Sequence, residues 1–578
     1  MKFIDRAKAT ILNTRKSFER FPVTIVLSIL FTGLLIYNFE VGNDLTNVAR
    51  DNLIRLTMVS GLGLLLSLCI GLLNERLFRA RGKSILTYII GGLILIGYYF
   101  FLLDKFEMVQ MTRFFGTILF LVVSVVYILK LKNDINYESY VIKVFSGVFI
   151  TILYSAVLYF GLSVIFFTVD NLFDIDISGK IYLYTFFIVV FIFGVSLFLS
   201  KLPEKDDDFK DYIYSKSLKV LLLYIVIPLI SVYTVILYAY FIKILITWVW
   251  PKGLVSHLVL WYSAVSAGVI FLITPLLEEN KLAKTFKIFF PKFILPILVM
   301  MFISIWQRIN QYGITENRYY ILVLGLWVLG IMLYFNFKKP LKNIIIPISL
   351  SIVIFISLYG PVSSYSMSKM SQNHRLNRIL ENNGLITNGA LVANPNVSKD
   401  DQKEISNIIS YFNNNHSLAD IKAMPNDFEV EDTKKLLGFE YSPVYGTPTN
   451  IDYFSYYLNN IGKQINISGY DYFLNISSWD TDTIHIEKEI EVKYSKDHIL
   501  TVEKVGKDII DVDINKFAEE MYNNKNSDKQ TNDIDKMTFT VDNKNIQLKI
   551  VFNNLYGQYN KETKEFNLKN AEFMLFIK

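Results

Sequence analysis

The sequence predicts an all-α polytopic membrane bundle of about 11 transmembrane helices, followed by an α+β domain outside the membrane. Three observations lead to this fold class. The 578 residues are 52% hydrophobic and only 19% charged, which is too apolar for a soluble chain of this size. Apolar runs long enough to cross the roughly 30 Å hydrocarbon core recur through most of the chain. This pattern stops near residue 361, where polar sequence with helical and then strand periodicity begins.

The apolar runs define the expected spans, because only helices and closed barrels satisfy every backbone hydrogen bond within a membrane. The ninth span is the weakest, since Pro291, Lys292 and Pro296 interrupt it. The expected spans are 21–39, 53–73, 85–103, 114–129, 144–169, 181–199, 220–242, 258–277, 289–306, 319–335 and 344–359.

Lysine and arginine set the expected orientation, because cytoplasmic loops carry an excess of both. When the N-terminus is placed inside, most of the flanking cations fall inside, including Arg76, Arg81, Lys338 and Lys339. An odd number of spans then places everything after residue 359 outside the cell. The abundance of Asn, Ile, Lys and Tyr is typical of an AT-rich bacterial genome. We therefore expect a multi-pass protein of a bacterial plasma membrane with an extracytoplasmic C-terminal domain.

Two segments make up the membrane part. Residues 1–20 interleave cations with apolar side chains and predict a basic amphipathic segment on the cytoplasmic side. Such a segment either lies on the anionic inner leaflet or caps the bundle, and the sequence leaves both open. Residues 21–360 form the transmembrane bundle.

Two further segments follow outside the membrane. Residues 361–425 predict a helical outer segment that continues from the last span and contains an amphipathic helix capped by Ser398. Residues 426–578 predict an α+β outer domain, because alternating apolar residues in 484–492 and 546–552 are typical of strands. A turn is expected just before 546, and a short helix near 515.

The usual marks of catalysis are missing from the sequence, which lacks a Walker loop, GxSxG, HExxH and Cys-x-x-Cys. The five histidines have no ligand spacing, and the single cysteine, Cys69, falls inside a span. We therefore expect no cofactor, no metal and no intrachain disulfide. One Ser-x-x-Lys match, Ser366 to Lys369, fits a lysine-activated nucleophile, but a polar helix leaving the membrane explains it as well. These absences weigh against an enzyme without excluding one.

Apart from Arg55 and Lys292, which lie near span ends, the expected spans contain no Asp, Glu, Lys, Arg or His. A charge at the bilayer centre costs about 2.5 to 3.5 kcal/mol on insertion scales and is retained mainly in ion or proton pathways. This argues against a proton-coupled antiporter. A transporter that uses broken helices and backbone carbonyls stays open.

The stretch WQRINQYGITENRYY, residues 306–320, falls at the outer rim between the ninth and tenth spans. Gly313 suits the turn, Thr315 suits a helix cap, and the aromatic residues suit the membrane interface. Arg318 falls near the positive end of the next helix, so we expect a separate anion beside it.

The same rim includes a second outer loop, TWVWPKGLVSH. Together the two loops predict a cationic, aromatic-walled mouth suited to an anionic headgroup or a lipid-linked phosphate. Interface anchoring and ion pairs to the outer domain are the alternative explanation. The candidate residues for ligand binding or domain docking are Arg308, Tyr312, Glu316, Arg318, Lys252 and His257.

The segments WPKGLVSHLV, QRINQYGITENRYY and SKMSQNHRLNRIL, in this order before a late α+β tail, resemble a bacterial family of multi-pass proteins known as domain of unknown function 4153. The resemblance runs from SFERFPVTI at residue 17 to the C-terminal strands. It implies the membrane class but no reaction, cofactor or catalytic residue.

Three functions from different classes fit the sequence. The first is a non-enzymatic envelope sensor or scaffold with an extracytoplasmic domain. The second is a transporter or flippase for lipid-linked or anionic envelope material. The third is a membrane-embedded transferase acting on lipid-linked substrates, with an acidic pair among Glu40, Asp44 and Asp51. The expected partners are the lipid bilayer and an anionic lipid headgroup or envelope polymer. The net charge of +6 follows from the inner loops and needs no nucleic acid.

Overall fold

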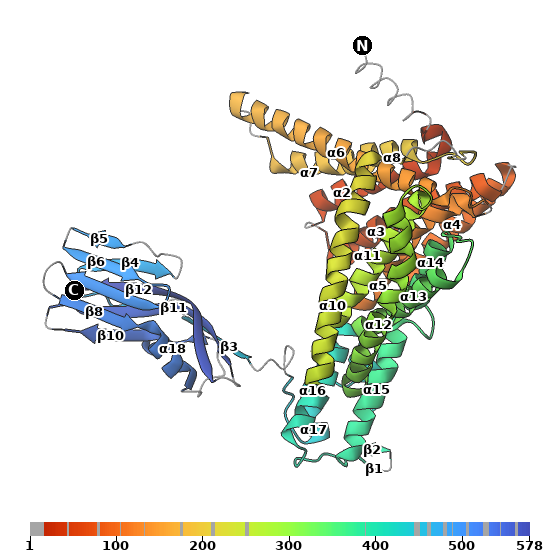
Figure 1. The fold of residues 1–578 in the computed structure, drawn as a ribbon. Coiled ribbons are helices and arrows are strands. Elements are labelled where there is room, and N and C mark those ends of the chain that lie inside the picture. Colours follow the sequence, from red (N-terminus) through yellow and green to blue (C-terminus); the bar gives the residue numbers. More distant parts are fainter. Residues whose placement is uncertain are drawn as a thin grey trace. The chain divides into compact units, whose positions relative to one another are not determined.

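The protein is described by a computed structural model that covers residues 15, 17–42, 45–77, 81–104, 106–131, 133–173, 177–207, 209, 214–248, 254–387, 389–443, 451–458, 464–477, 483–487, 489–504, 508–523, 531–543, 545–560 and 564–578. The chain divides into two compact units, Met1–Pro443 and Val444–Lys578 (Figure 1). The amphipathic segment expected at 1–20 lies mostly outside the described residues.

Within the described residues, 10 helices are long and apolar enough to cross a membrane, and a shorter apolar helix follows them. They match the expected spans one to one, so the polytopic all-α bundle is confirmed. Their bounds are α2 Pro22–Val41, α3 Asn47–Leu77, α4 Arg81–Phe101, α5 Met108–Tyr127, α6 Tyr137–Phe173, α7 Gly179–Phe187 continuing into α8 Val195–Lys201, α9 Lys216–Val220 continuing into α10 Ile227–Thr247, α11 Leu254–Ile273, α12 Lys281–Tyr312, α13 Glu316–Phe337 and the shorter α14 Ile345–Leu358.

The ninth expected span is a continuous helix, α12, although it contains Pro291 and Pro296. The helix begins after Asn280, whose side chain accepts a hydrogen bond from the Ala283 N–H at 3.1 Å. Neighbouring helices stabilise α12 in the region that contains the prolines. α11 and α13 pack along its buried side, which includes Leu298. Prolines are tolerated in membrane helices where such packing compensates for the lost hydrogen bonds.

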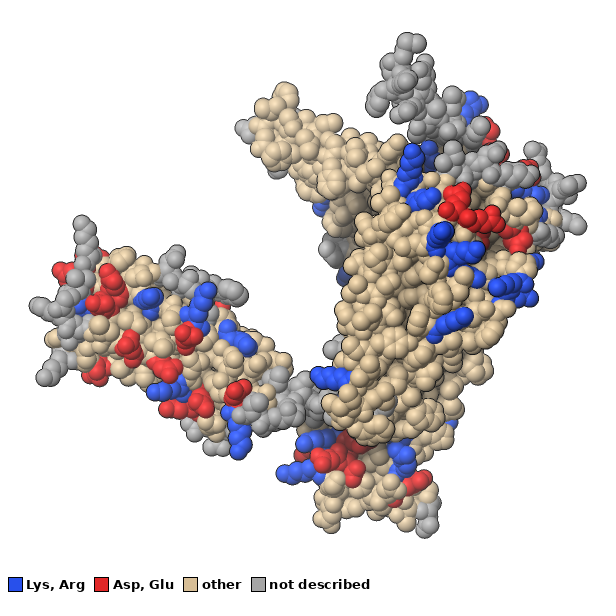
Figure 2. Space-filling model, viewed as in Figure 1, with Lys and Arg blue, Asp and Glu red and all other residues tan. Residues whose placement is uncertain are grey.

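Contacts between helix ends show which ends lie together. Arg20, before α2, pairs with Glu75 near the end of α3 at 2.7 Å and donates to the Leu202 carbonyl after α8 at 2.9 Å. At the opposite end, Tyr365 lies 2.8 Å from the hydroxyl of Thr112 near the start of α5. These contacts fit helices that cross the membrane in alternation. In Figure 2 the charged side chains gather toward the two ends of this unit and are sparse between them.

The bundle has two apolar cores. One lies among α2 to α5 and the start of α6 and includes Leu72. The other lies among α10 to α13 and includes Leu298. α14 packs against both α5 and α13 and so joins the two groups. Cys69 belongs to the first core, where it is 6% exposed and its Sγ lies 3.4 Å from the Leu121 carbonyl oxygen.

Residues 359–443 form a helical segment that belongs to the same unit as the bundle. It contains α15 (Ser364–Asn382), α16 (Lys399–Asn415) and α17 (Thr433–Leu437), with a small hairpin of β1 (Ile386–Thr387) and β2 (Ala390–Leu391). We call it the α15–α17 segment. Its core includes Leu376, Ile405 and Phe412, each 0% exposed. Ser398 caps α16 as predicted, because its hydroxyl accepts from the Asp401 N–H at 3.1 Å.

One expectation about this segment is wrong, because the last span does not continue into it as a single helix. α14 ends at Leu358, and α15 begins at Ser364. Gly360 turns the chain with a φ of +88°, a value that favours glycine.

The second unit is α+β, as predicted. One sheet has the strand order β4-β12-β11-β3-β9 with β10 paired to β11, and a second sheet has the order β5-β6-β7-β8. α18 (Ile514–Asn523) contributes to the shared core, which includes Leu548 and Phe573. The strands are β3 Ile451–Leu458, β4 Tyr472–Ser477, β5 Ile484–Ile486, β6 Ile490–Tyr494, β7 Ile499–Lys504, β8 Asp508–Asp513, β9 Thr531–Asn532, β10 Thr538–Asp542, β11 Gln547–Asn560 and β12 Glu565–Ile577.

The strand signals in the sequence correspond to hairpins. The expected turn before 546 joins β10 to β11, which pair with Val541 opposite Leu548. The alternating run 484–492 folds back on itself as β5 and β6, with Ile484 opposite Val492. Glu487 begins this reversal with a φ of +47°.

Candidate functional site

The turn between α12 and α13 lies directly against α15, and we call this end of the bundle the rim. Gly313 has a φ of +69°, and a Cβ there would lie 2.8 Å from Nε2 of Gln372. The Ile314 N–H donates to the hydroxyl of Ser371 at 2.8 Å. The positive φ therefore favours glycine, and a side chain there would also displace the Gln372 amide from the carbonyls of Tyr312 and Ile314. Thr315 is the N-cap residue of α13, but its side chain makes no capping hydrogen bond.

Glu316, the first residue of α13, accepts hydrogen bonds from three side chains of the α15–α17 segment. Its Oε1 lies 2.7 Å from Ser368 Oγ, 2.6 Å from the Tyr411 hydroxyl and 2.9 Å from His416 Nε2. We call these four residues the Glu316 cluster. The Glu316 side chain is 16% exposed and that of His416 is 1% exposed. A carboxylate so enclosed is stabilised by charge-assisted hydrogen bonds.

Aromatic rings enclose the histidine of the cluster. Tyr365, Tyr411 and Phe412 lie within 5.3 to 5.6 Å of the His416 ring, centroid to centroid. Tyr365 also reaches α5, because its hydroxyl lies 3.2 Å from the Met108 carbonyl oxygen. The cluster thus joins α13, α15 and α16 and extends to α5.

Burial fixes the protonation of the two tyrosines. It raises the pKa of Tyr365 to about 12. Burial and the neighbouring Glu316 charge raise the pKa of Tyr411 well above its usual range. Both hydroxyls therefore keep their hydrogens at neutral pH, and Tyr411 can donate to Glu316.

The cluster contains the residue types of a nucleophilic triad, but its hydrogen bonds differ. In a triad the carboxylate holds one ring nitrogen and the other takes the serine proton. Here Ser368 Oγ and Glu316 Oε1 both lie near His416 Nε2, at 3.5 and 2.9 Å. His416 Nδ1 has no partner among the described residues. Ser368 is 0% exposed, so a substrate has no access to its hydroxyl in this conformation.

The serine and the lysine of the Ser-x-x-Lys match also bond to different partners and not to each other. The Ser366 hydroxyl lies 3.0 Å from the Ser363 hydroxyl, whereas Lys369 Nζ pairs with Asp420 at 2.9 Å. An ammonium group held by a carboxylate is a poor general base. The geometry therefore supports the simpler explanation, in which these residues belong to a polar helix.

Arg318 lies against the end of the preceding helix. Its Nη1 donates to the carbonyl oxygens of Gly313 at 2.8 Å and Tyr312 at 3.2 Å. Arg375 from α15 donates to the same Tyr312 oxygen at 3.3 Å. Both guanidinium groups lie within 6 Å of the Tyr312 ring centroid, at 5.5 and 5.7 Å. The negative C-terminal end of α12 thus takes the place of the anion expected beside Arg318.

The remaining candidates fall into three situations. His257 of α11 lies 3.2 Å from the Asn317 side chain, so the structure brings it to the start of α13. Arg308 has no hydrogen-bond or ion-pair partner among the described residues. It lies close enough to Arg318 for the two positive charges to repel each other. Lys252 lies outside the described residues. Ligand binding by any of these residues stays a prediction.

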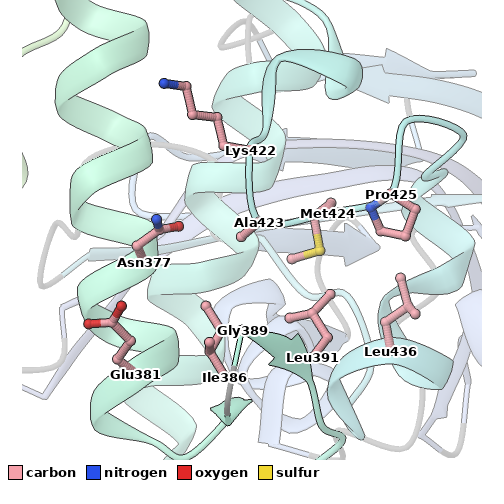
Figure 3. A pocket seen from close by; sticks show the side chains of 10 residues that line it. All are labelled: Asn377, Glu381, Ile386, Gly389, Leu391, Lys422, Ala423, Met424, Pro425 and Leu436. Carbon is pink, nitrogen blue, oxygen red and sulfur yellow. The ribbon is translucent and has the colours of Figure 1, made fainter.

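Two neighbouring pockets open on the α15–α17 segment. The rim pocket, of about 520 Å³, lies between the end of α12 and α15 and is lined by Arg375 and Arg378. The second pocket, of about 500 Å³, has walls of mixed polarity from α15, the β1–β2 hairpin, the chain after α16, and α17 (Figure 3). Asn377 and Glu381 line both pockets.

Sequence reasoning missed the partners of Glu316, because they lie 52 or more positions away. One signal was present in α15, where Ser364, Ser368 and Gln372 recur every fourth residue and are all buried. A helix that places polar residues at core spacing is expected to pack against a polar partner.

Comparison with known proteins gives one family match and one relative. Residues 13–405 match the sequence profile of a family described as Domain of unknown function (DUF4153). An uncharacterized protein of Pasteurella multocida (strain Pm70) is 26% identical over 214 residues, which are 37% of this chain and 36% of that protein. The alignment therefore spans little more than a third of this relative. No solved structure matches the chain.

Proposed function

Since the chain belongs to the family described as Domain of unknown function (DUF4153), we propose that it is a non-enzymatic envelope scaffold. In this proposal the helix bundle holds the α15–α17 segment and the sheet unit at the outer face of a bacterial plasma membrane. The bundle supplies anchorage, and the parts beyond residue 359 supply the interaction with other envelope material.

The Glu316 cluster is the observation that carries this proposal. It joins a membrane-crossing helix to two helices beyond the last span through one buried carboxylate. Polar networks between elements favour one arrangement of those elements, and the Glu316 carboxylate is well supplied with donors here, although His416 Nδ1 has no partner among the described residues. The candidate nucleophile and its histidine are used in this joint, which fits a structural role better than catalysis.

The sheet unit offers a surface for a partner. On β3 and β11 the side chains of Tyr453, Tyr457 and Tyr556 are 58%, 45% and 39% exposed. On the paired strands, one buried side-chain oxygen in each of three residues has no partner among the described residues, and these residues are Ser455, Asn554 and Asn570. Register places Ser455 opposite Tyr556 and Tyr556 opposite Asn570. Exposed tyrosine rings suit an envelope polymer that carries rings and hydroxyl groups, because a tyrosine offers both an apolar face and a hydroxyl.

The scaffold proposal is tested by comparing Ser368→Ala with Glu316→Gln in a strain that depends on the protein. Glu316→Gln should loosen the joint, lower the melting temperature and expose the α15–α17 segment to protease. Ser368→Ala removes one of three donors and should retain most of the cellular function. Glu431→Gln, at an exposed site, is the control. Loss of function in Ser368→Ala at an unchanged melting temperature would instead identify a catalytic serine.

A second candidate function, transport of lipid-linked material, is favoured by a polar site inside the bundle. Ile188–Gly194 is π-helical, and such stretches are frequent at functional sites. Ser28 donates to the Phe191 carbonyl there, and the hydroxyls of Thr151 and Ser155 beside Gly194 have no partner among the described residues. A scrambling assay with fluorescent lipids in proteoliposomes tests this candidate. Transport that falls in Ser155→Ala would support it.

The transferase hypothesis has less support from the described residues. Glu40, one of its expected acids, pairs with Lys180 at 2.8 Å and accepts a hydrogen bond from Tyr184. Asp44 lies outside the described residues. An acid held in this way is less available to a substrate.

A further inference from the structure

The rim pocket brings together polar groups that neither the scaffold proposal nor the Glu316 cluster uses. Its volume is about 520 Å³, within the usual range for small-ligand sites. α12 and the turn after it contribute Asn310 and Gly313, and α15 contributes Ser371, Arg375 and Arg378.

Positive charge exceeds negative charge in and around this pocket. Arg375 and Arg378 line it, and Arg318, which lies outside the lining, is close enough to Arg308 and Arg375 for their like charges to interact. The opposing carboxylates belong to Glu404, which is bonded to Arg375, and Glu381, which lies in the wall shared with the second pocket. Arg308 and Arg378 have no carboxylate partner among the described residues.

Two donors are held in place at the wall. The Arg375 side chain is 13% exposed, and its Nη groups are bonded to the Tyr312 carbonyl and Glu404. Its buried Nε has no partner among the described residues. The Ser371 hydroxyl accepts from the Ile314 N–H at 2.8 Å and can donate its own hydrogen. A buried donor without an acceptor, such as the Arg375 Nε, costs free energy, which an oxyanion bonded to it would recover.

The position of the pocket selects the source of the oxyanion. α12 crosses the membrane and ends at Tyr312, directly beside the pocket. Trp306, less than two turns earlier, is 64% exposed, as aromatic residues are at the level of lipid headgroups. A lipid phosphate therefore lies at the right depth.

The geometry points to a binding site in the rim pocket for the phosphate group of an anionic phospholipid. Arg378 in the lining supplies an unpaired cation, and Arg308, which precedes the lining residue Ile309, supplies a second one near it. Arg375 and Ser371 supply the fixed donors. This inference goes beyond the scaffold proposal, because the Glu316 cluster can hold the α15–α17 segment whether or not the pocket is filled.

The test uses the full-length protein in detergent and follows lipid binding by native mass spectrometry. The probes are phosphatidylglycerol, phosphatidylcholine and inorganic phosphate as competitor. Arg308→Gln/Arg378→Gln removes the two unpaired cations. Arg378→Lys keeps charge but loses the two-pronged hydrogen bonding. Lys422→Gln removes an exposed cation from the second pocket and is the matched control.

The parent should bind phosphatidylglycerol in preference to phosphatidylcholine. The double variant should bind phosphatidylglycerol roughly tenfold or more weakly at an unchanged melting temperature, because charge-assisted hydrogen bonds are lost. The affinity of Arg378→Lys for phosphatidylglycerol should lie between those of the parent and the double variant. The affinity of Lys422→Gln should equal that of the parent.

Competition identifies the source of the phosphate. Phosphatidylglycerol that resists millimolar inorganic phosphate supports a lipid site, whereas displacement overturns the lipid assignment in favour of free phosphate. A double variant that binds phosphatidylglycerol as the parent does would overturn the inference. So would an equal loss in Lys422→Gln, because the attraction would then be general.

Discussion

The membrane helices and the rim satisfy their polar side chains in opposite ways. Within the spans, many hydroxyl groups donate to a carbonyl of their own helix, as Thr57 does to Leu53 at 2.8 Å and Ser263 to Val259 at 2.6 Å. Some, such as Ser28, instead reach a neighbouring helix. At the rim, Glu316 accepts from side chains 52 and 95 positions away. A hydroxyl that bonds within its own helix does not specify which helix packs beside it, whereas the rim carboxylate requires particular donors. Apolar packing therefore holds the bundle, and hydrogen bonds select its partner at the rim.

The largest effect is expected for Glu316→Leu. It leaves the donors of Ser368, Tyr411 and His416 without this acceptor, and each buried donor left unsatisfied costs about 1–3 kcal/mol. The melting temperature in detergent should fall, and protease should cut the α15–α17 segment before the bundle. Unfolding of both parts in one unchanged transition would contradict the comparison.

A smaller effect is expected for Gly313→Ala. The new Cβ would lie 2.8 Å from Gln372 Nε2 at a φ of +69°, so both a clash and backbone strain result. Strain of this kind costs about 1–3 kcal/mol. Gly330→Ala, in α13 with nothing within 4 Å of the new Cβ, is the matched control and should leave the melting temperature equal or higher. Equal losses in the two variants would show that the rim is no more demanding than a span.

The sheet unit offers a third place to examine cross-element hydrogen bonds. His498 lies 2.7 Å from the Tyr494 hydroxyl and 3.0 Å from the Leu568 carbonyl. Burial, the largest influence, lowers the pKa of His498, against the opposing effects of the Leu568 carbonyl, Asp497 and Asp513. The folded state thus favours the neutral ring, and stability present above the ordinary pKa near 6.5 is lost as pH falls below it.

A fragment of residues 444–578, which form a compact unit, should therefore melt at a lower temperature at pH 5 than at pH 7. His498→Asn should reduce this difference, because asparagine tolerates the φ of +58° and does not titrate. The measurement is thermal unfolding by circular dichroism at both pH values. An identical pH response in the variant would assign the effect to other groups.

The smallest effect is expected for Ser263→Ala inside α11. The serine is 0% exposed, but its hydroxyl donates only to its own helix. Its removal should cost less than about 1 kcal/mol. A loss as large as that of Gly313→Ala would show that hydroxyls in the spans also select their neighbours.

Hydropathy was sufficient for the spans because a span is a property of consecutive residues. Even α12 was predicted despite Pro291 and Pro296, since its total apolar length outweighs two local interruptions. The break after α14 was missed, although Gly360 and Pro361 together are a common turn signal. The apolar length of a span does not reveal whether its last turn continues into polar sequence.

The candidate site was predicted only in part, because its bonds depend on folding. The sequence placed Arg318 at the positive start of α13, but the turn at Gly313 brings the α12 carbonyls to it. The sequence identified Glu316 as a candidate but not His416, because the four residues before the histidine, 412–415, do not indicate a carboxylate partner. These contacts join residues 52 or more positions apart and form only when α15 packs against α13. The buried serines of α15 are the one sign in the sequence that this helix has a polar partner.

The burial of Cys69 has a practical consequence for determining sidedness. Its thiol is 6% exposed within the first apolar core, so a membrane-impermeant maleimide should not react with the folded parent protein. Each cysteine introduced at an exposed site then reports its own side of the membrane, with no need to remove a native thiol. Asn310→Cys should be labelled on intact cells and Lys339→Cys only after permeabilisation if the rim faces outward. The reverse pattern would invert the orientation while leaving every contact of the fold in place.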